Sequence, residues 1–299
     1  MSNRNIKIID AHFHLWNVDE NYYPWLSDPN RPSMVENRSA LPRNYLATDL
    51  LHDISNLNLV AGVHIQAEHD PRNPVRETEW LQQVADDPAS RGIPHGIVAN
   101  ADFASPDIEK VLEGHCAFAN VRGIRHAVHR RLDEPYDPLG DPEWVGNFPL
   151  LKKYELSFDL QLFPQQADAA VDLIRRNDDI QIVVTHAGMP FWPDPERRAL
   201  WRNSIRKYAA HPNVAVKISG FGGYDPAWSA QSIDPIVSEV IAAFGPDRCM
   251  LASNFPIEGL VKPYADIWAI YCDYFSGFSA AEQEMLFWRN AARIYRLQI

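Results

Sequence analysis

Short apolar segments rich in β-branched residues recur along this chain and alternate with segments of helical periodicity. Strands that are buried on both faces and separated by helices pair in parallel through right-handed crossovers. Eight such strands predict an α/β protein with a (β/α)8 barrel. The predicted strands lie in IKIIDAHFH (6–14), NLVAGVHIQAE (58–68), IPHGIVANADF (93–103), NVRGIRHAV (120–128), LSFDLQLF (156–163), IQIVVTHAG (180–188), NVAVKISG (213–220) and RCMLASNFP (248–256).

Amphipathic segments between these strands predict helices. They are ETEWLQQVADD (77–87), SPDIEKVLEGHC (105–116), QADAAVDLIRRN (166–177) and SIDPIVSEVIAAFG (232–245). An open doubly wound sheet is the structural alternative, but no G-x-G-x-x-G motif follows the first strand, so a dinucleotide-binding fold has no local support. A segment rich in proline and aromatic residues, at about 17–44, predicts a long ordered loop. No linker or repeat divides residues 1–299, which predicts a single domain.

Composition and charge limit the kinds of molecule that this protein is expected to bind. The chain has 299 residues, of which 46% are hydrophobic and 22% are charged, and its formal net charge is −11. Such an acidic balance argues against nucleic-acid binding, which requires basic patches. There is no apolar segment long enough for a membrane span or a secretory signal, and three cysteines suggest no disulfide framework. We therefore expect a cytoplasmic protein that binds a small molecule; a homo-oligomer is compatible with these properties.

The first predicted strand ends in two histidines one residue apart. Side chains at alternate positions of a strand lie on the same face, so His12 and His14 point the same way. Two imidazoles placed in this way can share one divalent metal ion. The pair alone is equally compatible with two hydrogen-bonded structural histidines, so the other strand ends decide between these interpretations.

In a parallel barrel the chemistry gathers at the C-terminal ends of the strands. Polar side chains stand at five further predicted ends. They are Arg125 and His126, Gln161, His186, Lys217 with Ser219, and Asn254. Each has a structural explanation when it is taken alone; a lysine can extend along apolar surface and a glutamine can cap a loop. Their joint placement favours one functional site.

Several motifs together resemble the amidohydrolase-related family, and within it the branch of sugar lactonases and 2-pyrone-4,6-dicarboxylate lactonases. They are IIDAHFHLW, ETEWL, VRGIRHAV, VVTHAG, VKISG and SNFP. The resemblance covers nearly the whole chain and implies a distorted (β/α)8 barrel of the metal-dependent-hydrolase type. It also implies a metal or water-activating centre at His12, His14, His186 and the position of Asn254, with the three histidines as ligands of a divalent metal such as zinc. By the same resemblance Arg125 holds a substrate carboxylate or lactone oxygen.

The chain departs from the family pattern at Asn254. The family commonly has S-D-W-P where this chain has Ser253-Asn254-Phe255-Pro256. An asparagine cannot accept a proton as a general base, although it can orient water. Candidate replacements for the base are a histidine, Glu68 or Glu258, and we expect Glu258 to be a solvated loop acid. The centre is therefore compatible with both metal-dependent and metal-independent chemistry.

These observations predict a lactonase that opens a sugar-derived or carboxylated cyclic ester by metal- or histidine-assisted attack of water. His12, His14, His186 and Asn254 are its predicted catalytic residues. Its predicted substrate-binding residues are Arg125, His126, Gln161, Lys217 and Trp16. The aromatic residues of the long loop, Trp16 among them, either stack on a sugar or pin the loop itself. A non-oxidative decarboxylase and a non-catalytic sugar-acid binding protein are the alternatives.

Overall fold

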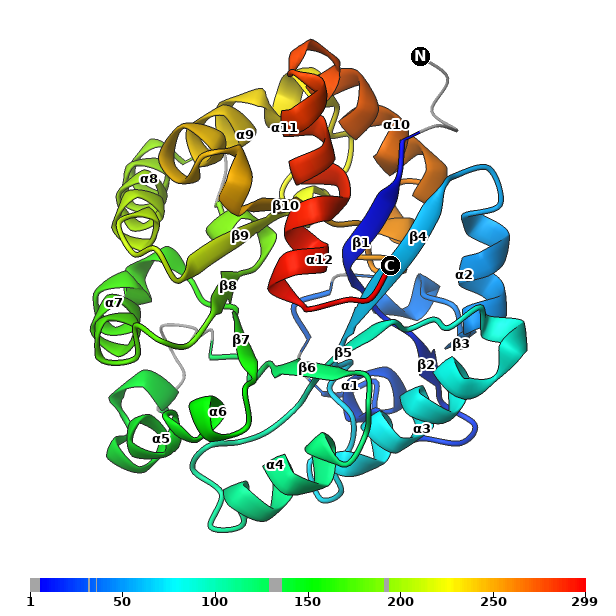
Figure 1. Cartoon of the computed structure of the whole chain (residues 1–299), viewed down its shortest axis with the longest axis vertical. Coiled ribbons are helices and arrows are strands. Elements are labelled where there is room, and N and C mark those ends of the chain that lie inside the picture. The colour runs from blue at the N-terminus through cyan, green and yellow to red at the C-terminus, as the bar shows by residue number, and fades with distance from the viewer. Residues whose placement is uncertain (1–5, 32, 36, 129–135, 191–193) are drawn as a thin grey trace.

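The computed structural model describes residues 6–31, 33–35, 37–128, 136–190 and 194–299. Its eight parallel strands form a nearly closed barrel in the order of the chain (Figure 1). Every predicted apolar segment contains one strand, so the predicted (β/α)8 barrel is confirmed. The strands are β1 (Ile8–Phe13), β4 (Leu59–Ile65), β5 (Gly96–Ala99), β6 (Val121–Ile124), β7 (Ser157–Leu160), β8 (Ile182–Val184), β9 (Val214–Ile218) and β10 (Cys249–Leu251).

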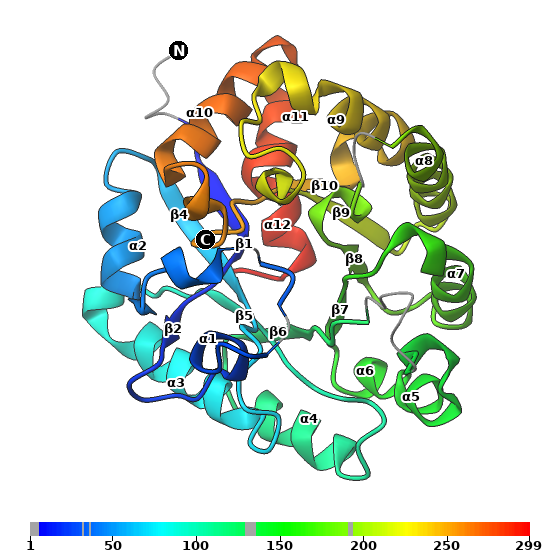
Figure 2. The same ribbon diagram turned by 180° about the vertical axis from the view of Figure 1, so that it is seen from behind.

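Helices surround the barrel (Figures 1 and 2), and the four predicted segments each contain one. These four are α3 (Val75–Asp86), α4 (Ile108–Cys116), α7 (Ala167–Arg176) and α9 (Ala230–Phe244). Further helices are α2 (Ala47–Asp53), α5 (Pro142–Asn147), α6 (Leu150–Lys153), α8 (Pro195–Ala209), α10 (Tyr264–Tyr274), α11 (Ala280–Glu284), a π-helix (Met285–Arg289) and α12 (Asn290–Ile294). No helix within the described ranges combines the length and apolar composition that crossing a bilayer requires.

The predicted long loop contains short elements of its own. β2 (Trp16–Asn17) pairs antiparallel with β3 (Asn44–Tyr45), and α1 (Pro24–Ser27) lies between them. The ring of Trp16 is fully buried, and its indole N–H donates to the Pro42 carbonyl. The loop is therefore pinned by its own aromatic residues, and Trp16 offers no exposed face on which a sugar could stack. Pro32 and Glu36, within the predicted loop, lie outside the described residues.

A β-bulge in β1 decides which of its side chains face the barrel interior. Ile9 and Ala11 belong to the interior apolar cluster, whereas Phe13 packs in the layer between strands and helices. Asp10 pairs with Gly62 and Phe13 pairs with His64, so three residue steps on β1 match two on β4. The extra residue reverses which side chains of the strand point into the barrel. Simple alternation from Ile9 would have put Phe13 inside, but at the strand end His12 and His14 point inward instead.

The barrel closes between its first and last strands through the buried side chain of Asp10. Its carboxylate accepts hydrogen bonds from the Ser253 amide (2.9 Å), the Ser253 hydroxyl (2.5 Å), the Tyr264 hydroxyl (2.8 Å) and the His12 amide (3.1 Å). Burial raises the pKa of Asp10, and these hydrogen bonds act in the opposite direction. Two backbone hydrogen bonds complete the seam, from Asn254 to His12 (2.8 Å) and from His14 to Phe255 (2.7 Å).

The C-terminal segment covers the end of the barrel at which the strands begin (Figure 1). Arg293 donates to the Asp247 carbonyl before β10, and Arg296 donates to the Arg122 carbonyl on β6. Figure 2 shows the opposite side of the barrel, with β2 and α1 near the viewer. The strand C-termini, where the predicted site residues stand, are thus on the side of the long loop.

Removing the Asp10 carboxylate should strongly destabilise the barrel. In Asp10→Ala the four donors at the seam lose their acceptor while they remain buried, and we expect the free energy of unfolding to fall by about 3–5 kcal/mol. Urea unfolding followed by circular dichroism measures this change. The matched control is Asp19→Ala, which removes an exposed ion pair with Arg43 and should cost at most about 1 kcal/mol. Equal losses in the two variants would contradict the role of Asp10.

Candidate active site

Three of the predicted residues, His12, His14 and His186, form one buried cluster at the strand ends. The Nε2 atoms of His12 and His14 are 3.3 Å apart, and the ring centroids of His12 and His186 are 4.6 Å apart. The Nδ1 of His14 lies 2.7 Å from the Ile65 carbonyl. A carbonyl only accepts, so this nitrogen carries the proton and the Nε2 of His14 presents a lone pair to the cluster.

His186 stands on an unusual backbone turn at the end of β8. His186, Ala187, Gly188 and Met189 have φ values of 50°, 50°, 71° and 57°, so four successive residues adopt the left-handed region. For a residue other than glycine this conformation costs of order 1–3 kcal/mol. The Trp201 indole N–H donates to the Ala187 carbonyl (2.7 Å), and the Ser219 hydroxyl lies 3.0 Å from the Nδ1 of His186. The surrounding contacts therefore hold His186 in place against local strain.

The histidine pair has the spacing that a zinc ion requires. Tetrahedral zinc with Zn–N bonds near 2.0–2.1 Å separates two nitrogen ligands by about 3.3–3.4 Å, which matches the 3.3 Å between His12 and His14. The Nδ1 of His12 is buried and has no hydrogen-bond partner among the residues described. Among the residues that the structure describes, no group of three His, Cys, Asp or Glu side chains is arranged to hold one metal ion. His12 and His14 thus fit two positions of a metal site, with His186 beside them.

Arg125 enters the same region from the end of β6. Its guanidinium is almost fully buried and donates to the Gln161 side chain (3.0 Å) and to the Gln66 carbonyl (2.5 Å). Its Nε has no hydrogen-bond partner. No carboxylate of the described ranges lies within ion-pair distance of Arg125, although the more distant carboxylates of Glu68 and Asp159 favour its charged form. A buried guanidinium without a carboxylate partner suits the binding of an anionic or strongly polar group.

Lys217 lies deeper in the barrel, where a carboxylate neutralises its charge. Its ammonium group pairs with Asp159 at 2.5 Å, and both side chains are fully buried. The Tyr295 hydroxyl, from the C-terminal segment, donates to the same carboxylate (2.8 Å). Burial, ahead of these contacts, lowers the pKa of Lys217 to about 8. Asp159 was not among the predicted residues, although the alternation of LSFDLQLF puts it on the same face as Gln161.

The electrostatics of the cluster keep its histidines neutral. Burial is the largest cause, followed for His186 by the positive charges of Arg125 and Lys217, and together they lower the pKa of His186 to about 3. The pKa values of His12 and His14 are lowered well below the ordinary range, again by burial first and then by a buried cation, which is Lys217 for His12 and Arg125 for His14. Neutral imidazoles are good metal ligands. A group with so low a pKa is, however, a weak general base at neutral pH.

Glu258 is not the solvated loop acid that the sequence predicted. Its side chain is only 3% exposed, and one carboxylate oxygen accepts a hydrogen bond of 2.6 Å from the Gly222 amide. Burial raises the pKa of Glu258 to about 7. The prediction failed because the backbone turns after β10: the Glu258 amide donates to the Asn254 carbonyl (3.1 Å), which carries the acid back toward the barrel.

The other predicted residues have different surroundings. The Nδ1 of His126 accepts a hydrogen bond from the buried Trp144 indole (2.9 Å) and lies 3.6 Å from the Asp102 carboxylate. Glu68 is exposed and accepts a hydrogen bond from the Gln66 side chain (2.9 Å). Glu68 therefore stands at the mouth of the barrel, whereas the contacts of His126 are those of a residue that packs against α5.

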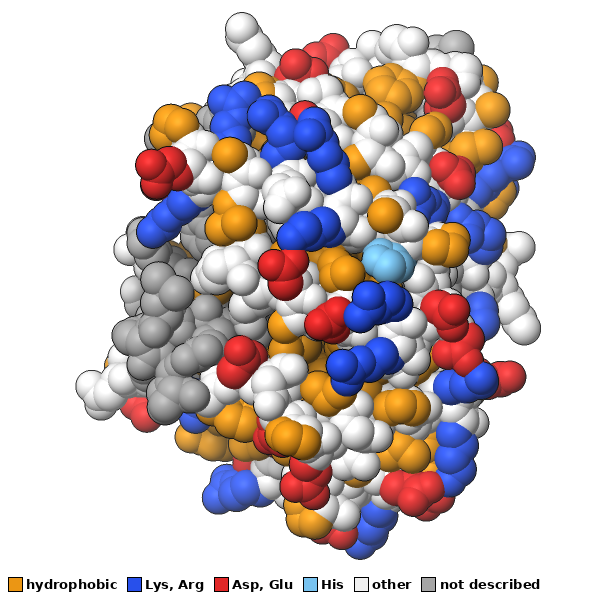
Figure 3. All heavy atoms as spheres, turned by 90° about the vertical axis from the view of Figure 1, so that its left-hand side faces the viewer, with side chains coloured by type: hydrophobic (Ala, Val, Ile, Leu, Met, Phe, Trp, Pro, Cys, Tyr) orange, Lys and Arg blue, Asp and Glu red, His pale blue; other side chains and the backbone are white. Residues whose placement is uncertain are grey.

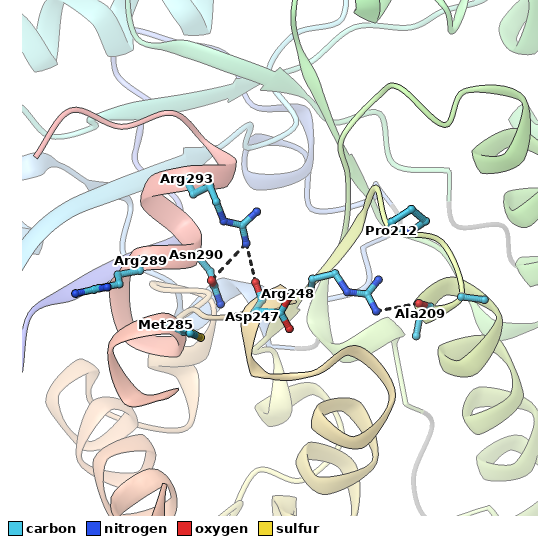
Figure 4. A pocket seen from close by; sticks show the side chains of 9 residues that line it. Ala209, Pro212, Asp247, Arg248, Met285, Arg289, Asn290 and Arg293 are labelled. Atoms are coloured by element: carbon cyan, nitrogen blue, oxygen red, sulfur yellow. Dashed lines mark hydrogen bonds between the residues drawn. The ribbon is translucent and has the colours of Figure 1, made fainter. Parts of the chain in front are cut away.

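One surface pocket formed by the described residues lies away from the histidine cluster. It has a volume of about 850 Å³ and is lined by residues near the start of β10 and along the C-terminal segment (Figure 4). Arg248 there donates to the Ala209 carbonyl, and Arg293 donates to the Asp247 carbonyl. On the face that carries α7 and α8, basic and acidic side chains are mixed (Figure 3). Neither region contains a residue of the histidine cluster.

Comparison with known proteins identifies relatives over nearly the whole chain. The family described as Amidohydrolase matches residues 9–297. The protein y4mH of Sinorhizobium fredii is 44% identical over 98% of this chain and 99% of its own. An L-fucono-1,5-lactonase of Burkholderia multivorans is 28% identical over 97% of this chain and 96% of its own. A crystal structure of a Burkholderia multivorans amidohydrolase with bound zinc superposes with a TM-score of 0.79, at 27% identity, over 97% of this chain and 99% of its own.

Zinc binding should depend on the two facing histidines. We expect His12→Ala and His14→Ala each to weaken zinc binding by about 100-fold or more, because each removes one of the two nitrogens with ligand spacing. Ser219→Ala should weaken it about 10-fold if His186 is a further ligand, since Ser219 orients that ring. Competition with a fluorescent chelator measures the affinities, with the exposed His52→Ala as control. Unchanged affinity in His12→Ala would exclude this metal site.

The buried histidines should also make stability depend on pH. Burial lowers the pKa of His64 to about 3, so between about pH 6.5 and pH 3 the unfolded chain binds a proton there that the folded protein does not. Stability from this group is complete above pH 6.5 and is lost as the pH falls. His64→Gln should reduce the slope of unfolding free energy against pH by about 1.4 kcal/mol per unit. Urea titrations between pH 7 and pH 4.5 test this, and parallel curves for wild type and variant would contradict it.

Proposed function

The chain belongs to the Amidohydrolase family of hydrolases, and we propose that it acts as a lactonase on sugar-derived or carboxylated cyclic esters. The observation that carries this proposal is the cluster of neutral histidines beside a buried guanidinium without a carboxylate partner. The first can hold a water molecule or a metal, and the second can hold the acyl oxygen or an acidic group of the substrate. The lactonase among the relatives supports the same reaction class.

In this mechanism the protein positions water and ester. A water molecule at His12, His14 and His186 attacks the lactone carbonyl carbon, while Arg125 donates hydrogen bonds to the oxygen that becomes negative. The bond between the acyl carbon and the ring oxygen then breaks. The proton that the attacking water releases passes to the ring oxygen, which becomes a hydroxyl group, and the oxygen of that water becomes part of the new carboxyl group. Gln161 fixes the orientation of Arg125 by the hydrogen bond between them. A metal ion held by His12 and His14 would supply Lewis acidity and a lower pKa for water.

The barrel interior below the histidines contributes charge without touching the ester. The Lys217–Asp159 pair is fully buried, so we assign Lys217 an electrostatic role and not the direct substrate contact that the sequence predicted. Its positive charge is one cause of the low pKa values of His12 and His186. Neutral histidines in turn leave their lone pairs available for water or metal at neutral pH.

Turnover of sugar lactones should depend on Arg125. We expect the wild type to open 1,5- or 1,4-lactones of sugar acids, releasing acid that a pH indicator detects. Arg125→Ala should lower kcat/KM by about 30- to 1,000-fold, equivalent to about 2–4 kcal/mol, because the developing negative charge loses its buried partner. Arg125→Lys should recover part of the loss, since a lysine keeps the charge without the bidentate geometry.

The control for this experiment is Arg72→Ala, whose side chain is 80% exposed and pairs with Asp70. This variant should retain the kinetic constants of the wild type. An unchanged kcat/KM in Arg125→Ala would remove Arg125 from the site. Tight binding of a sugar acid with no turnover of any lactone would instead favour a binding protein over an enzyme.

A further inference from the structure

The site contains an acid that neither the family pattern nor the proposed reaction uses. Glu258 is buried directly behind Asn254, the residue that stands in place of the family aspartate. The turn from Asn254 to Glu258 is closed by the backbone hydrogen bond between them (3.1 Å). The Asn254 side chain also stabilises the charged form of Glu258 and so acts against the effect of burial on its pKa. Asn254 and Glu258 are therefore neighbours across one backbone turn.

The protein holds this carboxylate in a fitted position. The Gly222 amide donates to Glu258 Oε1 at 2.6 Å, and a Cβ atom on Gly222 would lie only 2.8 Å from the same oxygen. Two residues earlier, a Cβ atom on Gly220 would lie 2.7 Å from the Nδ1 of His186. One segment after β9 thus presses its bare backbone against both the catalytic histidine and the acid, which is the packing expected of a built site and not of an incidental loop contact.

The place of Asn254 at the end of the barrel follows from its neighbours along the chain. Ala252 lies in the interior cluster, whereas Ser253 turns outward to Asp10 and Phe255 packs against Tyr264 on the outer side. Asn254 itself leaves the extended conformation, with a φ of 57°, at the turn that follows β10. Its backbone amide donates to the His12 carbonyl (2.8 Å), which places Asn254 next to the histidine cluster.

We propose that Glu258 is a positioning residue of the reaction centre and acts through Asn254. Its carboxylate receives a hydrogen bond from the Asn254 amide nitrogen and so fixes the amide oxygen toward the histidine cluster, where it accepts a hydrogen bond from the attacking water. In the family pattern the acid is the residue at position 254, whereas in this chain the acid is Glu258, which acts on the centre through Asn254. This inference rests on the proposed hydrolase function for its kinetic part and on the described contacts for its structural part.

The surroundings of Glu258 allow its ionisation to be followed. The titratable groups that act on it or feel its charge are Lys262, Tyr224 and Tyr271. Burial raises the pKa values of both tyrosines, so they stay protonated through the neutral range, and the charge of Lys262 lowers the pKa of Glu258. The Trp228 indole acts in the same direction, although its N–H makes no hydrogen bond of regular geometry among the described residues. A change near pH 7 at this position therefore reports Glu258.

The kinetic test exchanges the acid and the amide. Glu258→Gln should lower kcat about 10- to 100-fold with KM changed less than about 3-fold, because the water loses its oriented acceptor only in the transition state. The double variant Asn254→Asp with Glu258→Gln has the same net charge as the wild type and returns the carboxylate to the family position. It should recover most of kcat and should show a different pH profile, since another carboxylate now titrates. Glu143→Gln, at an exposed position, is the matched control.

A purely structural role for Glu258 predicts the reverse pattern. The exchange would then combine two losses, and kcat of the double variant would lie at or below that of Glu258→Gln. That result would overturn the proposal. The proposal would also be overturned if Glu258→Gln lowered both kcat and the free energy of unfolding, and if the double variant recovered neither of them.

A second measurement does not require a substrate. The side-chain amide signal of Asn254 in a nitrogen-15 NMR spectrum, assigned by its absence in Asn254→Ala, should shift between pH 5.5 and pH 8 in the wild type and stay constant in Glu258→Gln. If no lactone is hydrolysed but this shift is seen, the proposed function fails and the coupling of Glu258 to Asn254 stands. A signal that does not respond to pH in the wild type would overturn the coupling itself.

Discussion

One buried carboxylate holds the barrel closed. Asp10 accepts hydrogen bonds from groups on its own strand, on the turn after β10 and on α10, and so it replaces the regular strand ladder that is absent between β1 and β10. The partners lie 243 and 254 residues away in the chain. Contacts of such long range carry a large loop-closure entropy and form late in folding. The histidines follow Asp10 directly, so the geometry of the cluster depends on the same seam.

The electrostatic character of the site follows from what surrounds this cluster. Two buried cations, Arg125 and Lys217, lie near three histidines, and only one of the cations has a carboxylate partner at ion-pair distance among the described residues. One buried guanidinium is thus left without an ion-pair partner inside a protein of net charge −11. Burial and these cations together keep the imidazoles neutral, so that they can bind a metal or water but are weak proton acceptors at neutral pH.

The sequence was informative about the fold and about the residues that periodicity places at strand ends. Alternating apolar and amphipathic segments were sufficient for the barrel, and the convergence of His12, His14 and His186 follows from their positions at the ends of β1 and β8. The environment of single side chains was less predictable. Glu258 looked like a loop acid because nothing local shows that a turn returns it to the barrel, and Trp16 and Lys217 carry no sign of complete burial. Asp159 and Tyr295 meet only through tertiary packing, 136 residues apart.

The left-handed turn from His186 to Met189 has a consequence for how the protein tolerates change. Three of its four residues have a Cβ atom, so a glycine or asparagine there would relieve strain and raise thermal stability. The same substitution would give the turn other conformations and let the His186 ring leave its place. Stabilising mutations selected for heat resistance alone should therefore accumulate in this turn at the expense of turnover, whereas selection for activity should preserve the strained residues. The turn marks a place in this barrel where stability and function oppose each other.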